Sequence, residues 1–376
     1  MTKALITGIR GFMGKNLSVA LKRLPGVRVE GFDLGDDAGR LEGCIREGVD
    51  VIYHLAGANR PREESEFFEV NVGLTERIVD LAGSAASPPV MVFSSSIQAE
   101  LDNPYGRSKR DAEEAFSRYA RRSGRPVLIY RLPNVFGKWS RPDYNSVVAT
   151  FCANIAGGRE ARIDDPHRKL TFVYIDDVVR EFTRFCREPL VPASSQTGRG
   201  EVTPQYQMTV GGLAETIRRF HESRQGSLIP SLEDPLSRYL YATYLSFLGE
   251  GDLARVLQVK RDARGWLAEV IKSAGFGQIF VSQTRPGITR GNHYHDTKVE
   301  KFLVVQGEAL IRLQCVADGR SVEYRVSGAE PSLVDIPPGF AHSLTNIGAG
   351  DLLTIFWADE IFDPVLSDTY PQEVAR

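Results

Sequence analysis

The sequence predicts a doubly wound parallel α/β domain followed by a smaller all-β domain. Strand and helix patterns alternate through about residue 137, a glycine-rich turn follows the first strand, and short strands separated by turns occupy the chain from about residue 253. A chain of 376 residues exceeds what one hydrophobic core usually holds, so two domains are expected. The turn residues Gly249–Asp252 are the favoured boundary, which predicts domains of residues 1–250 and 251–376.

Charge and composition exclude several classes of protein. The chain has 46 basic and 48 acidic residues and no long basic run, which argues against nucleic-acid binding. No apolar run approaches the roughly 18 residues of a membrane span, and the N-terminus begins directly as a strand. The four scattered cysteines predict neither a disulfide framework nor a thiolate metal site. We therefore expect a soluble cytoplasmic protein without membrane or nucleic-acid partners.

The first strand and the turn after it predict a dinucleotide site. Lys3–Thr7 is an apolar strand, and glycines at intervals of three separate it from a helical stretch at Lys15–Leu24. Glycines in such a strand, turn and helix unit let backbone N–H groups approach a pyrophosphate at the helix N-terminus. The candidate cofactor-binding residues in this turn are Gly8, Arg10, Gly11, Phe12, Met13 and Gly14.

Two residues near this turn predict opposite cofactor preferences. The second strand, Val27–Phe32, ends at Asp33, where an acidic residue commonly binds the ribose 2′-hydroxyl of NAD. Arg10 lies inside the glycine turn, where its guanidinium could hold the 2′-phosphate of NADPH. Arg40 is a further candidate for the phosphate. These residues alone leave the choice between NAD and NADPH open.

The third strand ends in small residues. Val51–Gly57 is apolar and closes with Leu55, Ala56 and Gly57, which suit a backbone that lies close to a cofactor. His54 lies within this run, and we expect a hydrogen-bonded strand histidine rather than a catalyst. A helix is expected at Phe67–Leu81.

Residues 94–109 carry the strongest chemical signal of the N-terminal half. Ser94–Ser96 follow an apolar strand and would lie at its carboxyl end, where open α/β sheets bind ligands. Tyr105 and Lys109 are four residues apart, so on a helix they share one face. Because a nearby ammonium favours an ionised phenol, Lys109 is expected to lower the pKa of Tyr105. Tyr-x-x-x-Lys alone is common by chance, so its interpretation as a catalytic pair depends on the surrounding motifs.

The C-terminal half contains a candidate metal site. His293 and His295 alternate along an expected strand, so both imidazoles would point to the same face. Glu300 and the distant His342 complete a set of three imidazoles and one carboxylate. Such a set suits zinc or another divalent transition metal. Three of the chain's six histidines belong to it, which a solvated strand would rarely produce.

The N-terminal motifs together resemble the extended short-chain dehydrogenase/reductase family acting on nucleotide sugars, which implies a Rossmann fold for roughly residues 1–245. The motifs are Gly8-x-x-Gly11-x-x-Gly14, Ser96, Tyr105-x-x-x-Lys109 and Arg131-x-x-Asn134-Val135-Phe136-Gly137. The resemblance implies that Tyr105 is the catalytic acid and base and that Lys109 holds the nicotinamide ribose. Ser96 matches the catalytic serine or threonine of the family, with Ser95 as the alternative.

The same resemblance bears on substrate and cofactor. Asn134 and the segment Tyr174–Val179 match parts of the family that border the sugar-nucleotide pocket. In related NADPH-dependent sugar reductases a basic residue stands at the place of Arg10. The resemblance therefore favours NADPH, despite Asp33.

The histidine motif of the C-terminal half resembles the cupins, which implies a jelly-roll domain. The first motif is Gly287-x5-His293-x-His295-x4-Glu300-x6-Gly307 and the second is Pro337-x-Gly339-x-x-His342-x3-Asn346. A glycine expected upstream of the second motif is absent, and Pro331 stands there. This departure falls on a turn rather than on a ligand. Zinc is the expected metal, and whether its role is catalytic or structural stays open.

Across nearly the whole chain, finer segments resemble the CapF-type enzymes of bacterial capsule and O-antigen assembly. They include His54–Pro61, Asp102–Gly106, Phe136–Trp139, Tyr144–Val147 and Gly291–His295. The resemblance implies a homodimer of the UDP-N-acetyl-L-fucosamine pathway. Its cupin would epimerise C3 of a UDP-2-acetamido-2,6-dideoxy-hexos-4-ulose, and its reductase would then reduce C4 with NADPH to UDP-2-acetamido-2,6-dideoxy-L-talose.

Two alternatives stay open beside this hypothesis. One is a nucleotide-sugar epimerase or dehydratase that recycles a tightly bound NAD(P) and uses the cupin structurally. The other is a nucleotide-sensing protein with an inactive reductase fold. Such sensors usually lose Tyr-x-x-x-Lys, whereas this chain keeps Tyr105, Lys109 and Ser96.

Overall fold

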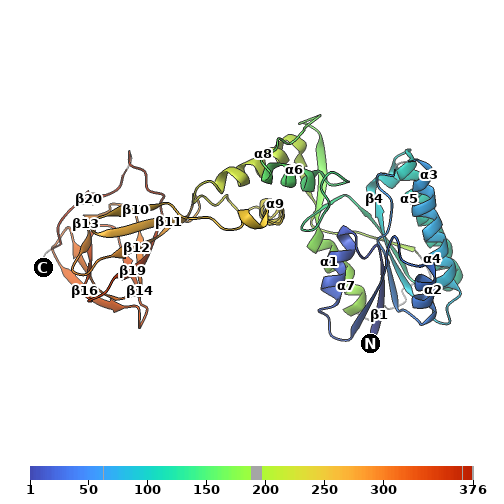
Figure 1. Cartoon of the computed structure of the whole chain (residues 1–376), viewed down its shortest axis with the longest axis horizontal. Helices are drawn as coiled ribbons and strands as arrows, with labels where there is room; N and C mark the ends of the chain where they lie inside the picture. Colours follow the sequence, from blue (N-terminus) through green and yellow to red (C-terminus); the bar gives the residue numbers. More distant parts are fainter. Residues whose placement is uncertain (62, 188–196, 366, 375–376) are drawn as a thin grey trace. The chain divides into compact units, whose positions relative to one another are not determined.

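The computed structural model describes residues 1–61, 63–187, 197–365 and 367–374. These residues form two compact units, shown in Figure 1. The N-terminal unit comprises Met1–Arg218 and Pro235–Gly249, and the C-terminal unit comprises Arg219–Asp234 and Glu250–Arg376. Among the described residues, no helix combines the length and the apolar character that crossing a membrane requires.

The units differ from the predicted domains, residues 1–250 and 251–376, in one segment. Arg219–Asp234 belongs to the C-terminal unit although it precedes the expected boundary. Backbone pairing explains this, because Ile229 N donates to Lys272 O at 2.7 Å and Lys272 N donates to Ser227 O at 2.8 Å. Such pairing between segments distant in sequence leaves no local pattern from which the boundary could be predicted.

The N-terminal unit is built on a six-stranded parallel sheet with the strand order β2-β1-β3-β4-β5-β8. The strands are β1 (Thr2–Thr7), β2 (Val27–Phe32), β3 (Val51–His54), β4 (Val90–Ser96), β5 (Val127–Leu132) and β8 (Thr197–Gly200). Its main helices are α1 (Phe12–Leu21), α2 (Ala38–Arg46), α4 (Leu74–Gly83), α5 (Pro104–Ser123) and α7 (Ile175–Arg187). Figure 1 shows α1 and α7 on one face and α2, α4 and α5 on the other, which is the doubly wound arrangement.

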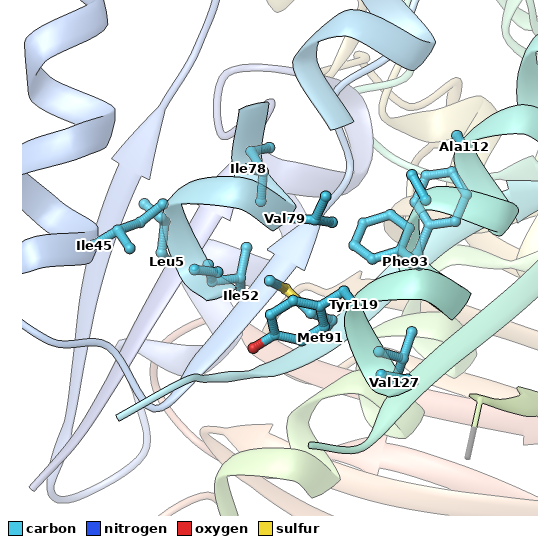
Figure 2. Packing of buried hydrophobic residues seen from close by; sticks show 14 of the residues in the cluster. Leu5, Ile45, Ile52, Ile78, Val79, Met91, Phe93, Ala112, Tyr119 and Val127 are labelled. Carbon is cyan, nitrogen blue, oxygen red and sulfur yellow. The ribbon is translucent and has the colours of Figure 1, made fainter. Parts of the chain in front are cut away.

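One face of this sheet carries a well-packed core, drawn in Figure 2. Met91 and Phe93 of β4 and Ile52 of β3 share one buried cluster with Ile78 of α4 and Tyr119 of α5. All five are almost fully buried. Burying a large apolar side chain contributes about 1.5–3 kcal/mol to stability. The core therefore holds the carboxyl ends of β1, β3 and β4, where the candidate residues lie, on a rigid support.

A second, smaller group of elements follows the main sheet. A three-stranded sheet has the order β6-β7-β9. Its strands are β6 (Asn134–Phe136), β7 (Lys169–Tyr174) and β9 (Tyr206–Thr209), and the helices around it are α6 (Val147–Ala156), α8 (Val210–Ser223) and α9 (Pro235–Leu245). A 3₁₀ turn, η2 (Ile97–Glu100), follows β4, and another, η3 (Glu250–Asp252), precedes the strands of the C-terminal unit.

The C-terminal unit is an antiparallel sandwich of two sheets. Their strand orders are β10-β11-β12-β19-β14-β17 and β16-β15-β18-β13-β20. The strands are β10 (Val259–Asp262), β11 (Gly265–Ser273), β12 (Gly277–Thr284), β13 (Thr289–Tyr294), β14 (Glu300–Gln306), β15 (Glu308–Cys315), β16 (Ser321–Ser327), β17 (Leu333–Ile336), β18 (Phe340–Asn346), β19 (Leu352–Ala358) and β20 (Tyr370–Pro371). The core between the sheets joins Phe302 and Phe356 of the first to Ile311 and Leu344 of the second.

Candidate functional site

The glycine turn after β1 has the tight geometry that a phosphate-binding turn needs. Gly8 has a φ of +74°. A Cβ on Gly14 would lie 2.1 Å from the carbonyl oxygen of Gly8, so only glycine fits there. Helix α1 begins directly afterwards, and its N-cap, Gly11, has no side chain to accept the first N–H groups. These N–H groups are directed out of the helix end beside Phe12 and Met13, as a pyrophosphate site requires.

Arg10 and Asp33 contact the same loop but use different atoms. The carboxylate of Asp33 accepts hydrogen bonds from Arg10 N at 2.5 Å and from Leu34 N at 2.8 Å. The guanidinium of Arg10 donates to Asp36 Oδ1 at 2.9 Å and to Leu34 O at 2.8 Å. The hydrogen bond from Arg10 lowers the pKa of Asp36, and the charge of Arg40 acts in the same direction. The Asp33 carboxylate thus fixes the backbone of the glycine turn, while the Arg10 side chain extends to the loop that follows β2.

His54 is hydrogen-bonded on both ring nitrogens, as its apolar strand predicts. The Thr7 hydroxyl lies 2.7 Å from His54 Nδ1, and the Thr75 hydroxyl lies 3.0 Å from Nε2. Thr75 donates its own proton to Asn71 O, so it accepts from the ring. Burial and, to a smaller extent, the charge of Lys109 lower the pKa of His54 to about 3. His54 is therefore a neutral structural residue at neutral pH.

The helix expected at Phe67–Leu81 is interrupted. The chain forms α3 (Ser65–Phe68), a π-helical turn η1 (Glu69–Gly73) and then α4. The turn contains Asn71, which is buried. Its side chain accepts from Ala58 N at 2.8 Å and donates to the Ser108 hydroxyl at 3.0 Å. A π-helical turn often marks a functional site, and this one ties the segment after β3 to helix α5.

Lys109 is buried beside this segment. Its Nζ donates to Ser94 O at 3.3 Å. A Cβ on Gly57 would lie only 3.2 Å from Nζ, so a larger residue would crowd the ammonium. Burial lowers the pKa of Lys109 to about 8, and the Glu113 carboxylate opposes part of this shift. Lys109 thus lies at the same sheet edge as Leu55, Ala56 and Gly57.

The pKa of Tyr105 corrects one expectation from the sequence. The predicted lowering by Lys109 is wrong for this structure, because burial raises the pKa of Tyr105 to about 12 and a hydrogen bond with Ser96 lowers it only in part. Lys109 Nζ lies 5.8 Å from the centre of the Tyr105 ring and donates elsewhere. The phenol is consequently protonated at neutral pH, which is the form that gives up a proton.

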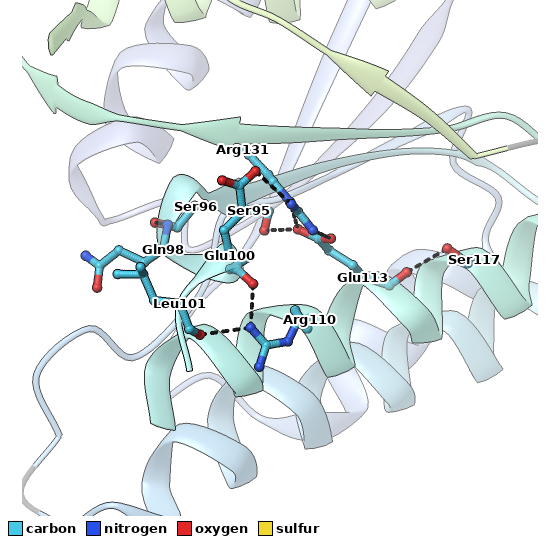
Figure 3. Close-up of polar contacts among 10 residues, drawn as sticks. Ser95, Ser96, Gln98, Glu100, Leu101, Arg110, Glu113, Ser117 and Arg131 are labelled. Atoms are coloured by element: carbon cyan, nitrogen blue, oxygen red, sulfur yellow. Dashed lines mark hydrogen bonds and ion pairs between the residues drawn. The ribbon is translucent and has the colours of Figure 1, made fainter. Parts of the chain in front are cut away.

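Figure 3 shows two serines of the run, Ser95 and Ser96, which differ in their partners. Ser95 donates to Glu113 Oε1 at 2.5 Å, and Glu113 forms a bidentate pair with Arg131, at 2.9 Å from Nε and 2.7 Å from the terminal nitrogen. Ser96 instead caps η2 and bonds Tyr105. The alternative, Ser95, is therefore engaged in the ion-pair network, and the geometry favours Ser96 for contact with a substrate.

We expect this network to be important for stability. The side chains of Glu113 and Arg131 are only 11% and 17% exposed. Glu113→Ala leaves the Ser95 hydroxyl without its acceptor and the largely buried guanidinium with only the exposed Glu100, 3.2 Å away. The variant should lose roughly 3–5 kcal/mol of unfolding free energy, measured by urea titration.

A matched control is Glu76→Ala, which breaks the half-exposed pair of Glu76 with Arg118. That variant should lose less than about 1 kcal/mol. Equal losses of unfolding free energy in the two variants would show that the Glu113 pair stabilises the protein no more than a surface pair does.

The predicted sugar-nucleotide residues lie around the small sheet. Asn134 on β6 donates to Thr171 O at 3.0 Å. The segment Tyr174–Val179 joins the end of β7 to the start of α7. Within it, Asp176 accepts from Lys138 Nζ at 2.7 and 2.9 Å. A role for Asn134 in substrate binding stays a prediction.

The four predicted metal ligands converge in the C-terminal unit. One possible ligand atom from each of His293, His295, Glu300 and His342 lies within 4.8 Å of all the others. Strand pairing sets His293 opposite His342. Glu300 comes from β14 of the other sheet, and its Oε2 lies 3.4 Å from Nε2 of both His295 and His342. The four candidate ligands thus converge from two sheets, the histidines from the β13 and β18 side and Glu300 from β14.

A bulge in β13 aligns these histidines. The register shifts between Gly291 and His293, and Gly291 and Asn292 have φ values of +92° and +59°. A Cβ on Gly291 would lie 2.6 Å from His342 O, so glycine is required for the close approach. Bulges re-aim side chains in this way.

The site offers the donor atoms that a metal centre needs. The Nε2 of His295 and both ring nitrogens of His342 are buried and have no hydrogen-bond partner among the described residues. Burial lowers the pKa of His342 to about 4, which keeps the imidazole neutral. Burial opposes ionisation of Glu300, but the histidines outweigh it and lower its pKa. Three imidazoles and one carboxylate are the donors that a divalent transition metal prefers.

Comparison with known proteins identifies the family of this chain. Residues 4–195 match the NAD dependent epimerase/dehydratase family, and residues 260–370 match the polysaccharide biosynthesis C-terminal domain. A relative from Pseudomonas aeruginosa, UDP-2-acetamido-2,6-beta-L-arabino-hexul-4-ose reductase, is 42% identical over 100% of this chain and 99% of its own length. The crystal structure of the capsular polysaccharide assembling protein CapF from Staphylococcus aureus matches with a TM-score of 0.91 and 40% identity, covering 99% of this chain and 100% of that chain.

The chain belongs to the CapF-type family of capsular polysaccharide enzymes. The match runs through both units, so the predicted fold class, a Rossmann domain followed by a cupin domain, is confirmed. A nicotinamide cofactor is a property of the matched epimerase/dehydratase family.

More distant structural neighbours cover a smaller share of this chain. A UDP-glucuronic acid 4-epimerase from Bacillus cereus, solved with NAD, has a TM-score of 0.56 and 17% identity, and it covers 65% of this chain. At that identity the likeness shows the fold alone.

Sequence reasoning missed several residues that support the candidate sites. Glu113 lies four residues after Lys109, and this helical spacing could have identified it. Asn71 lies within the helix predicted at Phe67–Leu81, and a π-helical turn has no clear sequence signature that would single it out. Asp368, which contacts His295, lies far from every motif in the sequence.

Proposed function

We propose that this CapF-type chain epimerises C3 of a UDP-2-acetamido-2,6-dideoxy-hexos-4-ulose and then reduces C4 with NADPH, giving UDP-2-acetamido-2,6-dideoxy-L-talose for capsule or O-antigen precursors. One observation carries the proposal. A protonated Tyr105 beside Ser96 and Lys109, and a cluster of three histidines with Glu300, occur together in a chain that matches a UDP-hexulose reductase from end to end. The first set suits reduction of a carbonyl and the second suits proton exchange beside one.

The reductase step follows from the first set of residues. NADPH, when bound, supplies the hydride for C4. Tyr105 donates its proton to the C4 oxygen, which its neutral state permits. Ser96, which already bonds Tyr105, orients that oxygen, and Lys109 holds the nicotinamide ribose. The glycine turn of Gly8, Gly11 and Gly14 binds the pyrophosphate.

The epimerase step follows from the second set. A divalent metal, with zinc as our proposal, would be held by His293, His295, Glu300 and His342 and would polarise the sugar carbonyl. The C–H bond at C3 is acidic only while C4 is a ketone. Epimerisation must therefore precede reduction, which locks the new configuration. This order gives a chemical reason for one chain to carry both sites.

One experiment tests the two activities together. The purified full-length chain would be incubated with the 4-keto UDP-sugar and NADPH in deuterated water, and the product would be analysed by NMR. We expect deuterium at C3, the L-talo configuration, and one NADPH consumed for each sugar. Turnover without net NADPH consumption would instead support an epimerase or dehydratase that recycles its cofactor.

Arg10 should determine the preference for NADPH. Its guanidinium lies at the loop after β2, whereas both Asp33 oxygens already accept backbone N–H groups. Charge-assisted hydrogen bonds contribute about 1.5–3 kcal/mol, so Arg10→Ala should weaken NADPH binding about 10- to 100-fold. Dissociation constants measured by fluorescence titration would check this.

The binding of NADH is the internal control for this prediction. It lacks the 2′-phosphate, so its dissociation constant should change little in Arg10→Ala. A second control, Arg28→Ala, removes an exposed arginine that pairs with Glu30 on β2. Equal weakening of NADPH and NADH would contradict a role of Arg10 in binding the phosphate.

A homodimer and a cytoplasmic location stay predictions.

A further inference from the structure

We infer that the C-terminal segment Asp368–Gln372 supports the metal centre, and that Asp368 is the residue that positions His295. The inference rests on the proposed metal site. It concerns residues that no motif assigns, since Asp368 lies 26 residues beyond the last candidate ligand, His342. Three independent sets of contacts carry it.

The first contact fixes the orientation of a ligand. His295 Nδ1 donates to the main-chain oxygen of Asp368. This bond places the ring proton on Nδ1 and leaves Nε2 with its lone pair, facing Glu300. Nε2 is one of the buried nitrogens without a hydrogen-bond partner in the described part of the chain. A histidine ligand that donates its other N–H to a carbonyl is held in the tautomer and rotation that metal binding needs.

The second set of contacts closes the loop between two ligands. The Asp368 carboxylate accepts from Asp296 N, Thr297 N and Lys298 N, each at 2.9 Å, and from the Thr297 hydroxyl at 3.0 Å. These three residues lie directly after His295 and before Glu300. A carboxylate that gathers successive N–H groups fixes the path of the loop, and so the spacing of the two ligands.

The third set aligns the segment with the strand that carries the other histidine. In β20, Pro371 pairs with His293 and Tyr370 pairs with Tyr294. The rings of Tyr370 and Tyr294 stack with centres 5.2 Å apart. Gln372 N donates to Asn292 O at 2.9 Å, at the bulge of β13. The segment therefore contacts the chain on both sides of the His-x-His motif.

Residues that orient metal ligands typically change metal affinity 10- to 100-fold when they are replaced. Asp368→Ala should therefore weaken Zn²⁺ binding by the full chain about 10- to 100-fold, measured by competition with a chromophoric chelator. Asp368→Asn tests the same point without changing side-chain size. Its amide keeps one acceptor oxygen but must present N–H groups to the donors that the other carboxylate oxygen accepts, so it should also weaken Zn²⁺ binding.

The matched control is Asp318→Asn. Asp318 lies in the same unit and its carboxylate also accepts a backbone N–H, from Arg320 at 3.0 Å, but it makes no contact with the candidate ligands. Its Zn²⁺ affinity should equal that of the unchanged protein. Adding excess Zn²⁺ to the Asp368 variants should restore deuterium exchange at C3, because a positioning residue changes metal occupancy and not the chemical step.

The possible outcomes separate this inference from the proposed function. If the unsubstituted protein binds Zn²⁺ and both Asp368 variants bind it equally well, the inference about Asp368 is overturned but the metal site is not. Failure of the unchanged protein to bind any divalent transition metal would overturn the metal site itself. If Asp368→Ala fails to fold, Asp368→Asn decides the question, and weakening there without a matching effect in Asp318→Asn supports the inference.

Discussion

Replacing Tyr105 by phenylalanine should remove most of the reductase activity while leaving the cofactor bound. In the proposed mechanism the hydroxyl is the proton donor to the C4 oxygen, and positioned general acids contribute about 10²- to 10⁴-fold to rate. The ring itself packs against Phe67, with centres 5.6 Å apart, and phenylalanine keeps that contact. The loss should appear in the rate of NADPH oxidation with the keto-sugar, while the dissociation constant of NADPH stays nearly constant.

A second tyrosine on the same helix provides a matched control. Tyr119 is buried in α5, and its hydroxyl donates to Pro89 O at 2.6 Å, far along the helix from the candidate site. Tyr119→Phe removes one buried hydroxyl and should lower stability by about 0.5–1.5 kcal/mol without changing turnover. Unchanged turnover in Tyr105→Phe would reject the role of Tyr105 in proton transfer.

Replacing both His293 and His295 by alanine should end metal retention and proton exchange at C3. Two of the four candidate ligands are then absent, and the remaining Glu300 and His342 are too few to hold a divalent ion in a closed site. Metal content would be measured by elemental analysis after dialysis. Deuterium uptake at C3 from deuterated water should fall to the background of the free keto-sugar.

The reductase unit reports whether such a variant is otherwise intact. We expect the double variant still to oxidise NADPH when it is given the C3-epimerised keto-sugar, because Tyr105 and Lys109 lie in the other compact unit. His167→Ala, which removes an exposed histidine from the N-terminal unit, is the control for loss of an imidazole. Persistent uptake in a folded, metal-free double variant would show that the metal is structural.

Much of this protein was predictable because its chemistry lies in short segments. The turn at Gly8–Gly14, the Tyr105 and Lys109 pair and the His293 and His295 pair each use a spacing that a helix or strand turns directly into a shared face. The alternation of strands and helices likewise follows from local hydrophobic patterns. These signals need only neighbours in sequence, and the fold class and the family followed from them.

Other features depend on neighbours that the sequence does not bring together. The sign of the Tyr105 pKa shift was predicted wrongly, because the amount of surface buried around the phenol outweighs a charge four residues away. Arg10 and Asp33 gave conflicting signals until the structure showed which atoms each one uses. In both cases the deciding contacts come from other parts of the chain.

By itself, then, the sequence determined the two-domain architecture, and it predicted the reductase residues and the metal-ligand set, since each follows from residue type and local spacing. Only the tertiary structure decided that Ser95 joins Glu113 and Arg131 while Ser96 contacts Tyr105, and that His295 donates to the main chain of Asp368. The physical reason is that burial and hydrogen bonding act over a few ångströms in space. Folding sets those distances between residues that lie far apart in the chain.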